Sequence, residues 1–455
     1  MVWGVLMENI EKINSLINGI VWGPFMLSIL LGIGIFYTIK LKFFQVRHFK
    51  VWWRLTFLSM FDKSSRKGEK GKISPFQAMA TALAGAIGTG NIVGVASAIA
   101  LGGAGAIFWM WIAAVFGMAT IYAENVLGMK YRTQKNGKYV GGPMYYIEKG
   151  LGQKWLAVIF AVICTVAALG MGNMTQANSV AGALKNGFGI SPEISGIIIA
   201  IAVGIIIFGG IDRIAALTEK LVPFMAVLYM LASAAVIIIN IKAVPAALER
   251  IFTEAFDLRS AAGGFMGYGM ARALKYGISR GVFSNEAGLG SSPIVHAAAD
   301  SSDPCRQGMW GMFQVFMDTI VLCTLMALCI LTTQSDLSSS DGIAVSTKAF
   351  ESVLGNGGKI FISLFIVLFA FATLVSWSYY GEKSLEYLVG TKPITIYRIF
   401  YAAVAYAGSV MSISLVWDIS DTLNGLMAVP NLAALILLSK EINYSEIKST
   451  HQLSR

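Results

Sequence analysis

The distribution of apolar residues along the chain predicts a bundle of membrane-spanning helices. A spanning helix needs about 20 mostly apolar residues in a row, because nothing in the bilayer core can pair with free backbone groups. Segments 153–184 and 262–296 are longer than a simple span, so we expect the first to be tilted or extended and the second to be broken. The eleven predicted spans are 16–40, 74–101, 104–128, 153–184, 192–210, 214–240, 262–296, 307–332, 359–388, 393–414 and 420–439.

The composition supports this class and argues against others. Of the 455 residues, 56% are hydrophobic and only 13% are charged, whereas a soluble domain carries about 25% charged residues. A soluble enzyme, a disordered scaffold and a nucleic-acid binder are therefore poor fits, in spite of a net charge of +10. The four cysteines form no CxxC pair and the three histidines are scattered, so no zinc site is expected.

The basic residues gather in two loops, which predicts the orientation of the chain. Loop 41–73 carries nine Lys and Arg residues and loop 129–154 carries six. Short loops rich in Lys and Arg stay in the cytoplasm, so we expect the N-terminus outside and the tail 440–455 inside. The amphipathic segment 244–262 is expected at the outer interface. The chain reads as one membrane domain over residues 1–455, with the first helix retained rather than cleaved.

The second predicted span contains a candidate break in its middle, at residues 84–91. Three glycines within six residues weaken a helix by about 1 kcal/mol each relative to alanine. Thr89 and Asn91 would also be out of place against lipid. An unwound point would free carbonyls for a cation and amides for an anionic group. Close helix packing of the GxxxG type is the alternative explanation for the same glycines.

A second candidate break interrupts the seventh predicted span at residues 283–293. Polar residues, two glycines and a proline stand there in an otherwise apolar stretch. A glutamate such as Glu286 is costly in a membrane unless it is paired or reaches water, and such residues mark functional sites. The alternative is that this stretch is only the polar end of the helix. One broken helix near the start of each five-helix half, 74–240 and 262–439, is the layout of inverted-repeat transporters.

Several runs resemble one known family, the alanine or glycine:cation symporters. The run GGAGAIFWMWIAAVFG at 102–117 is similar to the family's signature. GGPMYYIE at 141–148, FSNEAGLG at 283–290 and the following SSPIVH at 291–296 also match its pattern, in order. The resemblance covers the chain from about residue 10 to about residue 440.

The resemblance implies a fold and a function. The implied fold is an all-α polytopic membrane protein of the LeuT type, with about 11 transmembrane helices. Helix 16–40 would precede a core of two inverted five-helix repeats, in which 74–101 is core helix one and 262–296 is core helix six. The implied function is uptake of alanine or glycine across a prokaryotic plasma membrane, coupled to sodium or, in some members, to protons.

The same resemblance implies a sodium site between two helices. The carbonyls of Ala84 and Ile87 fall where such transporters coordinate sodium, and Ala370 and Thr373 of core helix eight would supply a carbonyl and a hydroxyl. Hard cations prefer such oxygen ligands. Leu374 departs from the pattern, because related symporters often carry a second hydroxyl there, so Ser376 or a water would have to substitute. The alternative for Thr373 is a hydrogen bond to the preceding turn.

The resemblance also implies the residues that bind the amino acid. The amides near Thr89, Gly90 and Asn91 would hold the carboxylate. Ser284 and Asn285 would accept the ammonium, and Phe283 or Trp377 would cover the small side chain, although Trp377 is equally well explained as packing. The remaining candidates lie on one face of core helix three: Gly172, Asn173 and Gln176.

The other charges within predicted spans are few, and other functions have little support. Glu124 and Glu382 are expected to be solvated or paired, while Glu286 could brace the break or carry a proton, and Arg280 could belong to an outer gate. An intramembrane enzyme would need a motif such as HExxH with convergent ligands, and a channel would need a filter loop; the sequence has neither of these. A proton-coupled carrier and an exchanger of small neutral amino acids stay open. We expect a lipid bilayer around the chain and no obligate protein partner.

Overall fold

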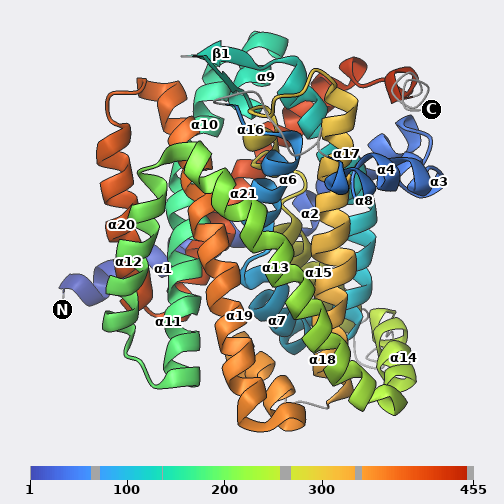
Figure 1. Cartoon of the computed structure of the whole chain (residues 1–455), viewed down its shortest axis with the longest axis vertical. Helices are drawn as coiled ribbons and strands as arrows, with labels where there is room; N and C mark the ends of the chain where they lie inside the picture. Colours follow the sequence, from blue (N-terminus) through green and yellow to red (C-terminus); the bar gives the residue numbers. More distant parts are fainter. Residues whose placement is uncertain (1, 63–71, 136, 257–267, 334–340, 448–455) are drawn as a thin grey trace.

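The computed structural model describes residues 2–62, 72–135, 137–256, 268–333 and 341–447 as a bundle of helices with one short hairpin (Figure 1). The hairpin is antiparallel and pairs Thr133 with Val140. The main elements are α1 Val2–Val21, α2 Pro24–Lys40, α3 Phe44–Arg47, α4 Phe49–Leu55, α6 Pro75–Ala86, α7 Val95–Gly102, α8 Gly105–Lys130, β1 Thr133–Lys135, β2 Lys138–Val140, α9 Pro143–Leu151, α10 Lys154–Leu169, α11 Thr175–Phe188, α12 Pro192–Ile207, α13 Gly210–Ile239, α14 Val244–Ala255, α15 Tyr268–Asn285, α16 Ser292–His296, α17 Pro304–Val315, α18 Thr324–Thr332, α19 Gly342–Val389, α20 Ile394–Val410 and α21 Ile413–Leu437.

The predicted all-α class is confirmed, and every predicted span coincides with helix. Among the described residues, seven helices are long and apolar enough to cross a membrane, and an eighth span is the bent pair Pro75–Ala86 and Gly90–Gly102. The other three predicted spans correspond to α12 and α20, which are shorter, and to α15 with α16, which is more polar. The number of membrane crossings therefore stays a prediction. Residues 262–267 and 448–455 lie outside the described part of the chain.

Two of the long spans change their helical winding in the middle. Between α10 and α11 the segment Gly170–Met174 (η3) is π-helical, and between α17 and α18 the segment Phe316–Cys323 (η6) is π-helical as well. Such bulges add a residue to a turn and are frequent at functional sites. Segment 153–184, predicted to be tilted or extended, lies in one span of 35 residues from Lys154 to Phe188, made of α10, η3 and α11.

The outer surface of the bundle is apolar where it would meet lipid. The outer face of α12, which packs against α20, exposes a row of isoleucines. A soluble protein seldom shows an apolar surface of this extent, and a lipid-facing helix requires it. The exposed α12 residues are Ile194, Ile197, Ile198, Ile201 and Ile205.

The two basic loops lie at the same end of the bundle. Figure 1 shows α3 and α4 from loop 41–73, and the hairpin and α9 from loop 129–154, toward its upper end. Helix α14 lies at the opposite end. We refer to these as the hairpin end and the α14 end. Their common location agrees with the basic loops sharing one side of a membrane, while the side itself stays a prediction.

Candidate functional site

The first break is the segment 87–89, which separates α6 from the π-helical turn Gly90–Gly94 (η2). The two halves of the span are bent by 47°. The Gly88 amide donates to Asn91 Oδ1 at 3.0 Å, and the Thr89 amide donates to Gln176 Oε1 of α11 at 3.2 Å. Both amides are thus paired with side-chain oxygens instead of the helix ladder. An oxygen of a bound carboxylate can take either place.

A group of oxygens meets beside this break. The Thr373 hydroxyl of α19 lies 2.9 Å from the Ala84 carbonyl and 3.3 Å from the Ile87 carbonyl. It also lies 3.1 Å from the Phe369 carbonyl one turn earlier, which is the structural alternative that the sequence leaves open. Ala370 is fully buried on the same helix. Three of the four predicted sodium ligands are therefore together, and buried neutral oxygens are what a hard monovalent cation requires.

Gly88 brings the amides and the oxygen group into contact. A Cβ atom at this position would lie 2.4 Å from Thr373 Oγ1 and 3.1 Å from Gln176 Oε1. No side chain fits in that space. The amides of Gly88 and Thr89 and the oxygens of Thr373, Ala84 and Ile87 are neighbours because position 88 is glycine.

The second break is the segment 286–291 between α15 and α16. Its backbone enters the left-handed region at Glu286, Gly288 and Gly290, with φ values of 62°, 92° and 81°. For glutamate this conformation is uncommon and must be stabilised by its surroundings. The Glu286 side chain accepts from Trp377 Nε1 of α19 at 2.7 Å and from the Ser291 hydroxyl.

Two further helices hold the same segment. Glu124 of α8 accepts from the Gly290 amide at 3.0 Å, and Asn431 of α21 donates to the Gly288 carbonyl at 2.9 Å. Asn431 also donates to Glu124 Oε1, at 2.5 Å. The predicted break of core helix six is therefore present, and three other helices fix its shape.

The helical turns next to the two breaks, η2 and the end of α15, meet at a buried aspartate that the sequence analysis missed. A Cβ atom at Gly90 would lie 3.1 Å from Ser284 Cα. The Ser284 hydroxyl donates to Asp318 Oδ2 at 2.9 Å, and Asn91 Nδ2 donates to Asp318 Oδ1 at 2.7 Å. Asp318 belongs to η6 and is fully buried. The rule that flags charged residues within spans would have found it.

Of the remaining predicted residues, Asn285 contacts η6 beside the breaks, whereas Asn173 is directed toward α20. Asn285 donates to Thr319 of η6 at 3.1 Å, next to Asp318. Asn173 instead donates to the Tyr401 carbonyl of α20 at 2.7 Å, so its amide group is directed toward that helix. Trp377 packs on Gly172, where a Cβ atom would lie 2.3 Å from Trp377 Cβ.

An ion pair and a ring stack join α15 to α21 beside the second break. Arg280 of α15 bonds Asp421 of α21 at 2.8 Å, and both side chains are largely buried, with 11% and 14% exposed. Phe283 stacks on Trp417 with 5.1 Å between the ring centroids, and the Arg280 guanidinium lies 5.2 Å from the Trp417 ring. Arg280 thus has a buried acidic partner on another helix.

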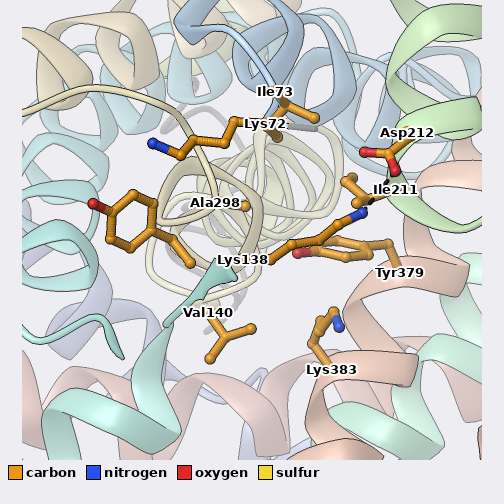
Figure 2. Close-up of a pocket in the computed structure, with 10 residues that line it drawn as sticks. Lys72, Ile73, Lys138, Val140, Ile211, Asp212, Ala298, Tyr379 and Lys383 are labelled. Carbon is orange, nitrogen blue, oxygen red and sulfur yellow. Dashed lines mark hydrogen bonds and ion pairs between the residues drawn. The ribbon is translucent and has the colours of Figure 1, made fainter. Parts of the chain in front are cut away.

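The contacts at the hairpin end are more exposed. Figure 2 shows a pocket there, between the hairpin, α13, α19 and the start of the second span, in which Lys138 reaches Asp212. That ion pair measures 2.6 Å, and its side chains are 45% and 55% exposed. Beside it, Arg132 donates to the carbonyls of Ala297 and Ala299 and so ties the hairpin to the segment after α16. Burial lowers the pKa of the Arg132 guanidinium below its usual value.

The other charged residues of the predicted spans have structural partners. Glu382 of α19 pairs with Arg398 of α20 at 2.8 Å, as expected for a paired side chain. Glu124 is fully buried, and its described partners are neutral groups. Glu382 therefore has a cationic partner, whereas the described partners of Glu124 are neutral.

Comparison with known proteins identifies the family. The model of the sodium:alanine symporter family matches residues 7–452. The sodium/alanine symporter AgcS of Methanococcus maripaludis is 46% identical over 99% of both chains. The probable sodium/glutamine symporter GlnT of Bacillus subtilis is 40% identical over 96% of this chain and 90% of its own. The resemblance carried by runs 102–117, 141–148 and 283–296 is thereby confirmed.

Solved structures show the fold. MhsT in complex with L-phenylalanine aligns with a TM-score of 0.59 at 15% identity, over 81% of this chain and 90% of its own. A mutant of the manganese transporter of Eremococcus coleocola aligns with a TM-score of 0.56 at 15% identity, over 80% of this chain and 76% of its own. Both are LeuT-fold transporters, so the predicted fold type is confirmed.

Proposed function

This chain belongs to the sodium:alanine symporter family, and we propose that it carries alanine, and also glycine, into the cell by alternating access. As a family member it is a multi-pass membrane symporter that couples an amino acid to sodium, and not an enzyme. The substrate within the family varies, since one relative is named for glutamine. The assignment to alanine and glycine therefore depends on this chain's own site.

The contact of the Thr373 hydroxyl with the Ala84 and Ile87 carbonyls carries the proposal. A sodium ion held there would join the first break to α19, with Ala370 as a further carbonyl ligand. Because the carbonyls are free only where the helix is unwound, cation binding would stabilise one geometry of the break. Sodium would in this way select the conformation whose amides donate hydrogen bonds to the substrate carboxylate.

The substrate would lie between the two breaks. The amides of Thr89, Gly90 and Asn91 would hold its carboxylate next to the sodium oxygens. Ser284 and Asn285 would accept its ammonium. A Cβ atom at Gly90 would lie 3.1 Å from Ser284 Cα, so η2 and the end of α15 are in close contact where the substrate would bind. This supports alanine and glycine over larger amino acids, with Phe283 and Trp377 as the covering rings.

Alternating access would open the two ends of the site in turn. The Arg280–Asp421 pair and the Phe283–Trp417 stack close the α14 end, and the hairpin contacts close the other. With the basic loops in the cytoplasm of a prokaryotic cell, the α14 end faces outward. Sodium and substrate would then enter at the α14 end and leave at the hairpin end.

Uptake into proteoliposomes tests the coupling. Labelled alanine should accumulate only when sodium is higher outside than inside. Equal uptake with sodium replaced by choline at fixed pH would contradict sodium coupling. An exchanger would be recognised by uptake that requires alanine inside the vesicles.

A pair of matched variants tests the sodium site. Thr373→Val keeps the shape of the side chain and removes the hydroxyl, so half-maximal uptake should require more sodium. Thr165→Val on α10 is the control, since within the described part of the chain that hydroxyl bonds the preceding turn, at the Ala161 carbonyl. An unchanged sodium activation curve for Thr373→Val would remove this residue from the site.

A further inference from the structure

We propose that a basic pocket at the hairpin end binds the head group of an anionic phospholipid. The pocket has a volume of about 390 Å³ and lies where β1, α9, α10 and the end of α19 meet. Its lining and that of the pocket in Figure 2 have no residue in common. Three of these elements contribute one lysine each, namely Lys135 of β1, Lys149 of α9 and Lys154 of α10.

The charge of these lysines is not neutralised within the described part of the chain. All three residues are exposed, and none forms an ion pair with a described residue. The ammonium groups of Lys135 and Lys149 lie over the Tyr145 ring, 5.6 and 5.9 Å from its centroid. Glu148, the acid in the lining, accepts from the Tyr387 hydroxyl at 2.8 Å. Three lysines and one glutamate give the pocket a net charge of +2, which attracts an anion.

The pocket in Figure 2 provides the contrast. It also contains three lysines, but an acid lies within ion-pair distance of each of them. Its positive charge is therefore already compensated by the protein, whereas that of the basic pocket is available to a ligand. The ion pairs of the pocket in Figure 2 are Lys72–Asp300, Lys138–Asp212 and Lys383–Glu386, at 3.3, 2.6 and 2.5 Å.

The apolar surface next to the basic pocket favours a lipid over a soluble anion. Val158 lines the pocket one turn after Lys154, and Val162 and Val166 follow on the same face of α10. All three valines are exposed. Since Lys154 begins the apolar span Lys154–Phe188, the lysines lie where head groups meet the hydrocarbon core. One molecule with a charged head and apolar chains would contact both surfaces.

A phosphodiester head group suits this arrangement. Its oxygens accept hydrogen bonds from ammonium groups, and basic pockets between spanning helices are typical sites for anionic head groups. Trp155 is exposed beside Lys154, as is usual for an aromatic side chain at the membrane interface. A lipid bound there would join the hairpin and α9 to α10 and α19. Because it binds only the folded protein, it should raise the unfolding temperature.

The experiment compares lipids that share their acyl chains and differ in their head groups. Purified protein in detergent is titrated with dioleoyl phosphatidylglycerol, which is anionic, and with dioleoyl phosphatidylcholine, which is not. A third titration uses glycerophosphoglycerol, the anionic head group without chains. Each lysine near an anionic lipid surface gives about a five-fold gain in affinity. Phosphatidylglycerol should therefore half-saturate the rise in unfolding temperature at a roughly 100-fold lower mole fraction than phosphatidylcholine. Glycerophosphoglycerol should have little effect at the same concentration.

Variants of the three lysines test whether this pocket is the site. Combining Lys135→Gln, Lys149→Gln and Lys154→Gln should remove the preference for phosphatidylglycerol. Arginine at the same three positions keeps the charge and should keep the preference. If the triple glutamine variant does not fold, each single glutamine variant should raise the half-saturating mole fraction about five-fold.

A matched control removes the same charge from another place. It combines Lys42→Gln, Lys50→Gln and Lys440→Gln, which are exposed lysines outside the pocket. Lys42 also lies over a tyrosine ring, that of Tyr444, at 5.3 Å from its centroid. The control should therefore keep the preference for phosphatidylglycerol.

Four results would overturn the inference, and none of them bears on sodium-coupled uptake. Equal half-saturation by the two lipids would exclude an anionic head-group site. A full preference in the triple glutamine variant would place the site elsewhere, and an equal loss in the control would reduce the effect to general surface charge. Stabilisation by glycerophosphoglycerol at the concentration at which the lipid acts would indicate a soluble anion as the ligand.

Discussion

Replacing Gly88 by alanine should impair sodium activation more than any other single-methyl change near the breaks. The added Cβ would lie 2.4 Å from Thr373 Oγ1, so the hydroxyl would have to move by about 1 Å to reach an ordinary contact of 3.4 Å. Such a movement changes its distances to the Ala84 and Ile87 carbonyls, which are 2.9 and 3.3 Å. Overpacking of this kind costs about 1–3 kcal/mol.

The cost translates into a measurable shift in sodium dependence. When the overpacking destabilises the sodium-bound state by about 1–3 kcal/mol, half-maximal alanine uptake requires a roughly 5- to 150-fold higher sodium concentration. The stabilisation of the purified protein by sodium, measured as the rise in its unfolding temperature, should decrease in parallel. Gly32→Ala on α2 is the matched control, because no atom lies within 4 Å of its added Cβ.

A double variant distinguishes steric conflict from general damage. In Gly88→Ala combined with Thr373→Ala, the methyl group no longer meets the hydroxyl. The two effects should therefore be less than additive. Normal sodium activation in Gly88→Ala, or strict additivity in the double variant, would refute the assignment of this contact to the sodium site.

Three further predictions concern the contacts around the site. Asp421→Asn should destabilise the protein by about 3 kcal/mol, because it leaves Arg280 without its acidic partner in a largely buried position, and thermal unfolding in detergent measures this. Lys138→Ala should change stability by less than about 1 kcal/mol in the same assay, because exposed ion pairs contribute little. Gly172→Ala should lower alanine affinity in a binding titration, because its Cβ would lie 2.3 Å from Trp377 Cβ and displace that ring; unchanged affinity would place the ring outside the substrate site.

Local patterns were sufficient to predict the helices and their breaks. The long apolar runs indicate membrane-spanning helices, and the glycines of 84–91 and 286–291 within those runs indicate where the helices are broken. The bend of 47° and the left-handed backbone at Gly288 and Gly290 follow from those same residues. The π-helical turns were not predicted, because an insertion of one residue per turn leaves almost no trace in an apolar sequence.

Side-chain partners across the bundle were harder to predict. Arg280 and Asp421 are 141 positions apart, and their contact depends on how α15 and α21 rotate against each other. The same holds for Asn173, whose helical face was predicted but whose amide is directed toward α20. The presence of Asp318 in a predicted span is visible in the sequence, but its hydrogen bonds to Asn91 and Ser284 could not be predicted from the sequence.

The two ends of the bundle differ in how their closing ion pairs respond to the ionic atmosphere. The Lys138–Asp212 pair at the hairpin end is about half exposed, whereas the Arg280–Asp421 pair is almost enclosed. At about 0.1 M salt the screening length is only about 10 Å, and it acts mainly on exposed charges. Added salt of any kind should therefore loosen the hairpin end selectively. A sodium titration without a choline counter-titration would mix this screening effect with true ion coupling.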